Sequence, residues 1–170
     1  MILIIMRHGE ATPYQANDKS RALTRFGLTQ SANAGKRLSD YFTGRGLAAS
    51  IDQVWVSPYL RTQQTYDAVS EHMHFNQKHD TDLITPMGRA NDVHDFIDGI
   101  LHQQNGGTET ADSKTPEHLM LISHMPLVSL LADKVCTGFN GKIFDTADIL
   151  IIDYDPTTHI GQQIALYQSI

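Results

Sequence analysis

The chain opens with an unbroken apolar run, Ile-Leu-Ile-Ile-Met at residues 2–6, which is followed directly by Arg7, His8 and Gly9. A short apolar run without polar alternation is typical of a strand that is covered on both faces, as in a parallel or mixed sheet between helices. In open sheets of this kind, ligands bind at the carboxyl ends of the strands. The run therefore predicts a central strand that delivers Arg7 and His8 to a ligand-binding edge.

The same pattern returns far along the chain, where residues 119–122 form a second strongly apolar run. His124 and Pro126 follow this run, and the proline marks the start of a predicted helix over residues 127–135. We expect the run to be a second buried strand. His124 should then lie at the same edge of the sheet as His8.

A third junction follows residues 54–56, Val-Trp-Val, which are dense in strand formers. Ser57 and Pro58 come next, and they predict the N-cap and the first position of a helix over residues 59–74. Arg61 falls in the first turn of that helix, beside unpaired N–H groups and the positive end of the helix dipole. A cation there indicates a bound anion, although a solvated arginine is the alternative.

The rest of the chain alternates between helical and strand patterns, which is typical of the α/β class. We expect a single domain over residues 1–170 with three layers, α/β/α, and a mostly parallel sheet with an antiparallel edge strand. No insertion is large enough to form a lid over a small substrate. The remaining expected helices cover residues 24–45 (with Thr24 as N-cap) and 93–102. We also expect a strand and loop over 78–86, a mobile loop over 103–117, and strands over 148–154 and 159–168, the last at the antiparallel edge.

Charge and cysteine usage exclude several classes of partner. The formal net charge of -6 argues against nucleic acid and against a polybasic membrane anchor. Cys136 is the single cysteine and excludes an internal disulfide, and no stretch predicts a signal peptide or a membrane span. His72 and His74 do not share a helix face and no cysteine joins them, so we expect no metal. We therefore expect a cytoplasmic monomer without a cofactor.

Together the three junctions present two guanidinium groups and two imidazoles, from Arg7, Arg61, His8 and His124. Guanidinium groups suit the bidentate capture of a phosphoryl group. A neutral imidazole is a nucleophile that forms a covalent phosphoenzyme, and a second, protonated imidazole stabilises the transition state. Arg21, in the polar loop before residue 24, is a further candidate for substrate binding, with a solvated loop arginine as the alternative.

Three blocks of the sequence, in this order, resemble the signature of the histidine phosphatase superfamily, whose fold is phosphoglycerate mutase-like. The blocks are Arg7-His8-Gly9, residues 57–65 (Ser-Pro-Tyr-Leu-Arg-Thr-Gln-Gln-Thr) and residues 123–126 (Ser-His-Met-Pro). The resemblance implies that His8 is the phosphorylated nucleophile. It implies that Arg7, Arg61 and His124 complete a pocket for inorganic phosphate or related oxyanions.

Within that superfamily the chain is most similar to the small phosphohistidine phosphatases. The similarity rests on the minimal length, on Met6, on residues 21–24 (Arg-Ala-Leu-Thr) and on residues 84–88 (Ile-Thr-Pro-Met-Gly). This resemblance implies a partner, namely the phosphorylated histidine-containing phosphotransfer domain of a two-component sensor kinase.

Many members of the superfamily use an Asp or Glu as general acid, and here only Asp82 and Glu10 are candidates. An alcohol leaves as an alkoxide whose conjugate acid resembles water, with a pKa of roughly 15.7. An imidazole whose far nitrogen, with a pKa near about 6.5, is protonated leaves as a neutral ring. Phosphohistidine therefore needs less proton assistance than a phosphate ester.

Two other functions remain open from the sequence. One is a phosphomonoesterase of broad specificity that uses Asp82 or Glu10 as the acid. The other is a module that accepts phosphate on His8 without hydrolysing it.

Overall fold

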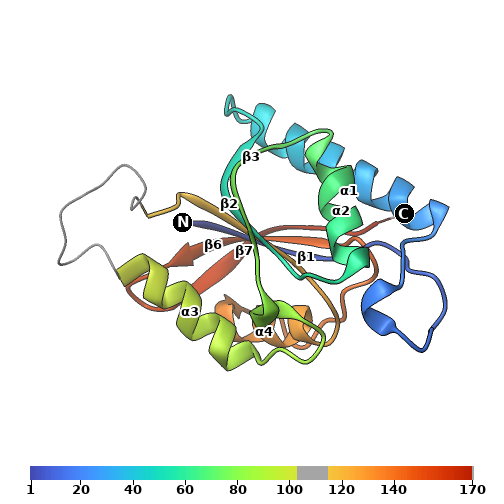
Figure 1. Ribbon diagram of the computed structural model, residues 1–170. Helices are drawn as coiled ribbons and strands as arrows, with labels where there is room; N and C mark the ends of the chain where they lie inside the picture. The colour runs from blue at the N-terminus through green and yellow to red at the C-terminus, as the bar shows by residue number, and fades with distance from the viewer. Residues whose placement is uncertain (103–114, 170) are drawn as a thin grey trace.

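The computed structural model describes residues 1–102 and 115–169, so the loop expected over residues 103–117 lies mostly outside the described residues. The described part contains four longer helices, two short 3-10 helices and one sheet (Figure 1). The strands are β1 (Ile2–Arg7), β2 (Ser50–Val56), β3 (His74–Asp80), β4 (His118–Ser123), β5 (Cys136–Thr137), β6 (Ile149–Asp155) and β7 (Ile160–Tyr167). The helices are η1 (Asp18–Ser20), α1 (Arg25–Thr43), α2 (Leu60–Ser70), η2 (Asp82–Ile84), α3 (Ala90–His102) and α4 (Leu127–Val135).

The seven strands lie in the order β3-β2-β4-β1-β6-β7-β5. β1 runs parallel to β4, and β2 runs parallel to both β3 and β4. β6 is antiparallel to its two neighbours, β1 and β7. The mostly parallel sheet is confirmed, and β7 is the antiparallel strand expected over residues 159–168. The two-residue strand β5 pairs with the outer side of β7, so β7 is not itself the last strand of the sheet.

Helices cover both faces of the sheet, with α1 and α2 on one side and α3 and α4 on the other (Figure 1). The side chains of β1 alternate between the two cores. Ile4 and Met6 pack in the core under α1, while Leu3 and Ile5 pack in the core under α4. All four side chains are fully buried. This two-sided burial is the reason why the strand shows no polar alternation, and it confirms the three-layer architecture.

The first turn of α1 is pressed against the loop that leaves β1. Thr24 caps the helix as expected, since its hydroxyl oxygen accepts a hydrogen bond from the Gly27 N–H at 2.9 Å. A Cβ atom on Gly27 would lie 2.0 Å from the carbonyl oxygen of Glu10. Only glycine permits this approach, so the contact holds the chain immediately after His8 in place.

The predicted helix over residues 59–74 is shorter than expected. α2 ends at Ser70, and His74 already begins the exposed edge strand β3. Ser57 is not the N-cap, because that position is taken by Tyr59, whose side chain makes no capping hydrogen bond. The hydroxyl of Ser57 is used in the site described below.

Across the described ranges, no helix has both the length and the apolar character that crossing a bilayer requires.

Candidate active site

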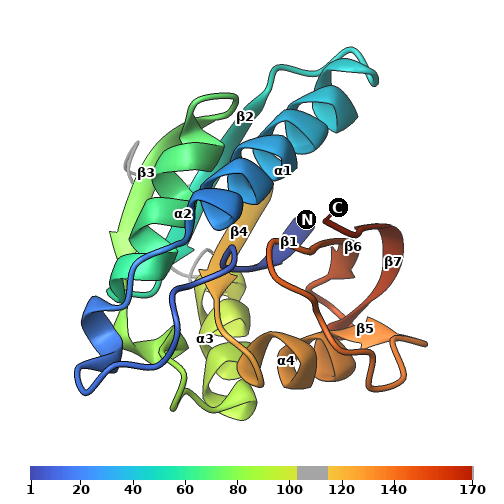
Figure 2. The same ribbon diagram turned by 90° about the vertical axis from the view of Figure 1, so that its right-hand side faces the viewer.

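Three parallel strands, β1, β2 and β4, end side by side and present their next residues at one edge of the sheet (Figure 2). The backbone is tied together there. The His8 N–H donates to the Ser123 carbonyl oxygen at 3.0 Å, and the Ser57 N–H donates to the Ile122 carbonyl oxygen at 3.2 Å. His8, Ser57 and His124 therefore follow the ends of neighbouring strands, as the sequence predicted for the two histidines.

His8 is oriented by its own loop. Its Nδ1 lies 2.7 Å from the Gly9 carbonyl oxygen, which can only accept, so Nδ1 carries the proton and donates. The lone pair of the neutral ring is therefore on Nε2. Burial, together with the positive charges of Arg61, Arg7 and Arg21, lowers the pKa of His8 to about 4. At neutral pH the side chain is uncharged, and its lone pair is available on Nε2.

His124 lies against His8, with the two ring centroids 5.2 Å apart. Its Nε2 is 2.7 Å from the hydroxyl oxygen of Ser57, and its Nδ1 is buried without a hydrogen-bond partner. Burial, and after it the neighbouring His8 and the arginines, lower the pKa of His124 to about 2. The site therefore favours a neutral His124, whereas the sequence led us to expect a protonated second imidazole.

Arg7 and Arg61 enter the site from the end of β1 and from the first turn of α2. One terminal nitrogen of Arg7 donates to the Phe144 carbonyl oxygen at 2.8 Å. Arg61 is 4% exposed, and its two terminal nitrogens bind Asp18 through the backbone carbonyl at 2.9 Å and the carboxylate at 3.2 Å. In both arginines Nε is buried and has no partner. Each guanidinium is anchored at its tip and keeps a donor free.

Arg21 joins the same group. A terminal nitrogen of Arg21 lies 3.5 Å from the Asp18 carboxylate, and its Nε is also buried without a partner. Its charge lowers the pKa of both His8 and His124, as do the charges of Arg7 and Arg61. Asp18 itself was missed by sequence reasoning. The only signal was its spacing of three residues from Arg21 in a short polar loop, and that spacing is common in loops without any function.

The buried polar atoms that lack a hydrogen-bond partner are concentrated in this site. Among the described residues, five buried side-chain nitrogen or oxygen atoms lack a hydrogen-bond partner, and four of them belong to the predicted site residues. These four are Arg7 Nε, Arg21 Nε, Arg61 Nε and His124 Nδ1. A buried polar atom without a partner costs about 1–3 kcal/mol. Three of these atoms are guanidinium N–H donors, and such a group is explained if an anion accepts from them.

The two carboxylates considered as general acids are placed differently. The Glu10 carboxylate accepts a hydrogen bond from the Thr24 hydroxyl at 2.8 Å and is exposed. Asp82 is exposed at the start of η2, a turn whose last residue, Ile84, accepts a hydrogen bond from Ser123 at the end of β4. Glu10 is thus engaged with the start of α1, whereas the turn that carries Asp82 is bonded to the end of β4.

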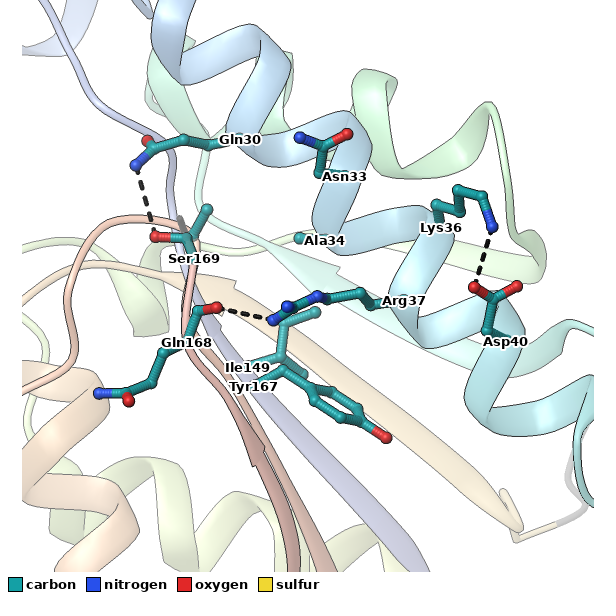
Figure 3. Close-up of a pocket in the computed structure, with 11 residues that line it drawn as sticks. Gln30, Asn33, Ala34, Lys36, Arg37, Asp40, Ile149, Tyr167, Gln168 and Ser169 are labelled. Atoms are coloured by element: carbon teal, nitrogen blue, oxygen red, sulfur yellow. Dashed lines mark hydrogen bonds and ion pairs between the residues drawn. The ribbon is translucent and has the colours of Figure 1, made fainter.

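A separate cavity of about 220 Å³ lies between α1 and the C-terminal segment (Figure 3). Its charged groups are already paired. Arg37 donates to the Gln168 carbonyl oxygen at 2.7 Å, and Lys36 binds the Asp40 carboxylate at 2.9 Å. The cavity therefore lacks the unpaired buried donors that mark the edge of the sheet.

Comparison with known proteins agrees with this geometry. Residues 3–89 match the family model of the histidine phosphatase superfamily (branch 1). The chain is 30% identical over 158 residues to the phosphohistidine phosphatase SixA homolog of Haemophilus influenzae, which covers 91% of this chain and 89% of that protein. It is 29% identical over 156 residues to phosphohistidine phosphatase SixA of Escherichia coli, covering 91% and 86% of the two chains. A solved structure of the protein histidine phosphatase SixA complexed with tungstate has a TM-score of 0.77 at 26% identity, covering 99% of this chain and 97% of the other.

Proposed function

Because the chain belongs to the histidine phosphatase superfamily (branch 1), we propose that it is a hydrolase that removes the phosphoryl group from phosphohistidine in proteins. The observation that carries this proposal is the set of unpaired buried nitrogen atoms of Arg7, Arg61 and His124 beside an imidazole whose lone pair is on Nε2. The relatives named phosphohistidine phosphatase, which align over most of the chain, support the choice of substrate.

In the first step, the Nε2 lone pair of His8 attacks the phosphorus of the substrate phosphohistidine. A bond from phosphorus to Nε2 forms while the bond from phosphorus to the substrate imidazole breaks. The departing nitrogen takes the electron pair, and a proton on the far nitrogen of that ring makes the leaving imidazole neutral. The phosphorylated His8 keeps its proton on Nδ1, where the Gly9 carbonyl stabilises the positive charge of the ring.

In the second step, a water molecule attacks the phosphorus and the bond to His8 breaks. The electron pair of the broken bond returns to Nε2, and the water oxygen remains on inorganic phosphate. One proton of the attacking water passes to solvent. Arg7, Arg61 and Arg21 neutralise the phosphoryl oxygens in both steps through their buried Nε donors, which have no partner in the resting protein. Arg7 and Arg61 are oriented before the substrate binds, because the Phe144 carbonyl oxygen and the Asp18 carboxylate bind their terminal nitrogens.

The partner that we propose is the phosphorylated histidine-containing phosphotransfer domain of a sensor kinase. A neutral imidazole is a leaving group that needs little proton donation, which suits a site where Glu10 is bound to Thr24. Inorganic phosphate and tungstate should occupy the same pocket and inhibit. A monomeric state and a cytoplasmic location stay predictions from the sequence.

The test compares two substrates with the wild-type protein and with Asp82→Asn. A phosphohistidine-containing phosphotransfer domain should be dephosphorylated much faster than a sugar phosphate, and Asp82→Asn should change that rate by less than about twofold, because no general acid is required. Faster turnover of the sugar phosphate that collapses in Asp82→Asn would instead assign a phosphomonoesterase. A long-lived phosphoenzyme without phosphate release would assign a phosphate-accepting module.

A further inference from the structure

We propose that Ser57 is a positioning residue that fixes the tautomer of His124, so that an N–H group rather than a lone pair faces the phosphoryl group. The inference rests on the proposed function for its chemical meaning, but the tautomer itself is a property of the resting protein. Its basis is the hydrogen bond between Ser57 and His124 together with the unpaired buried nitrogen on the other side of the ring.

The hydroxyl of Ser57 has few possible hydrogen-bond acceptors. Ser57 is fully buried, so solvent is not an acceptor. The Tyr59 N–H points at the hydroxyl oxygen from 3.5 Å, and an N–H is only a donor. The remaining contact of the hydroxyl is His124 Nε2 at 2.7 Å. The hydroxyl therefore donates to Nε2, which must carry the lone pair.

The proton of the neutral His124 ring is then on Nδ1. This nitrogen is buried and has no partner, as expected for a donor that waits for an oxygen atom of the ligand. With the opposite tautomer, the Nδ1 lone pair would face the negatively charged phosphoryl oxygens and repel them. Burial and the neighbouring His8 keep the ring neutral, so the tautomer decides whether Nδ1 attracts or repels the phosphoryl oxygens.

Ser57 is itself held firmly. Its backbone carbonyl oxygen accepts hydrogen bonds from the Thr62 hydroxyl at 2.8 Å and from the Gln63 side-chain amide at 2.9 Å. Both donors lie on α2, and the Ser57 N–H is bonded to the end of β4. The serine is thus fixed from two elements, which is what a residue that orients a reacting group requires.

The primary test uses wild-type protein without substrate. Nitrogen-15 NMR at pH 7 distinguishes a protonated ring nitrogen from one with a lone pair, and the His124 signals are those missing from a His124→Gln sample. We expect the proton on Nδ1 and the lone pair on Nε2. A proton on Nε2 would overturn the proposal, whether or not the protein hydrolyses phosphohistidine.

The second test compares Ser57→Ala with Ser31→Ala, since both serines are fully buried but Ser31 donates to the Gly27 carbonyl oxygen. Ser57→Ala should mix the two tautomers and lower kcat by about tenfold, less than the roughly 10²–10³ that loss of a whole oxyanion donor costs, because part of the protein keeps the right tautomer. Ser31→Ala should leave both unchanged, and Ser57→Thr should restore both. If Ser57→Ala keeps the wild-type tautomer and kcat, Ser57 does not have this role.

Discussion

Two histidine clusters lie at opposite ends of the sheet, and they differ in how their polar atoms are paired. At the start of β1, Tyr154 donates to the Asp98 carboxylate at 2.5 Å and lies 2.9 Å from His94, while His159 lies 3.0 Å from the other oxygen of Asp98. In the part of the chain that the structure describes, this cluster leaves no buried side-chain donor or acceptor without a partner. At the end of β1, the cluster around His8 leaves four buried side-chain nitrogen atoms unpaired.

The comparison shows that residue types alone do not distinguish a binding site from a structural network. Both clusters contain two histidines, an aspartate and a tyrosine, since the ring of Tyr59 packs against His124 with the centroids 5.1 Å apart. In both clusters these residues come from segments far apart in the sequence. The paired cluster joins α3 to β6 and stabilises the fold. In the unpaired cluster the tips of the arginines are bound by protein groups, and we propose that an anion accepts from the remaining donors.

The largest expected effect comes from exchanging one histidine in each cluster for alanine. His8→Ala should reduce the dephosphorylation of a phosphohistidine protein to background, because the nucleophile is lost. His94→Ala should retain the wild-type kcat while the protein unfolds at lower denaturant concentration. Full turnover by His8→Ala, measured as phosphate release, would contradict both the proposed mechanism and the distinction between the two clusters.

The pH dependence of the free energy of unfolding tests whether the histidines of the His8 cluster are buried and neutral. The folded protein holds the pKa of His8 at about 4 and that of His124 at about 2, below the ordinary value of 6.5. Between pH 6.5 and about 4 the unfolded chain therefore binds protons that the folded protein does not, so stability is greatest above pH 6.5 and falls as the pH is lowered. Urea unfolding at pH 7 and pH 5 should show this loss, and a smaller loss in His8→Gln. Equal losses in the two proteins would contradict the buried, neutral His8.

A smaller effect is expected from Asp18→Asn, which keeps the backbone contact to Arg61 but removes the charge that Arg61 and Arg21 share. We expect kcat/KM for the phosphohistidine protein to fall about tenfold, equivalent to about 1.4 kcal/mol, because the arginines lose their fixed orientation. Asp92→Asn, which breaks an exposed pair with Arg89, is the matched control and should retain wild-type kinetics. If the two variants behave alike, Asp18 does not position the arginines.

The smallest effect is expected from Tyr154→Phe in the paired cluster. Loss of the buried hydroxyl should lower the free energy of unfolding by about 1 kcal/mol and leave kcat unchanged. Thermal unfolding and steady-state kinetics of the same sample check both parts. A change in kcat would show that the two ends of the sheet are coupled.

The sequence predicted the elements whose cause is local or periodic. β1 and β4 were recognisable because both of their faces are buried, and Thr24 caps α1 as its residue type suggests. The strand β3 was expected near residue 78 and begins at His74, since an exposed edge strand lacks the apolar pattern that would mark its start. The convergence of His8 and His124 followed from the rule that parallel strands end at a common edge.

The missed features depend on contacts between distant segments. Ser57 looked like a helix cap, because the local preference of serine says nothing about a histidine 67 positions along the chain. Asp18 gave no usable signal, because its partner Arg61 is 43 positions away. Sequence reasoning also assigned a charge to His124, since the burial that lowers its pKa appears only in the folded protein.

The most direct test of the central claim is a crystal structure of the protein with bound tungstate. We expect the oxyanion beside His8 Nε2, accepting hydrogen bonds from the Nε atoms of Arg7 and Arg61 and from His124 Nδ1. A tungstate bound elsewhere, with Arg7 Nε, Arg61 Nε and His124 Nδ1 still unpaired, would contradict the account.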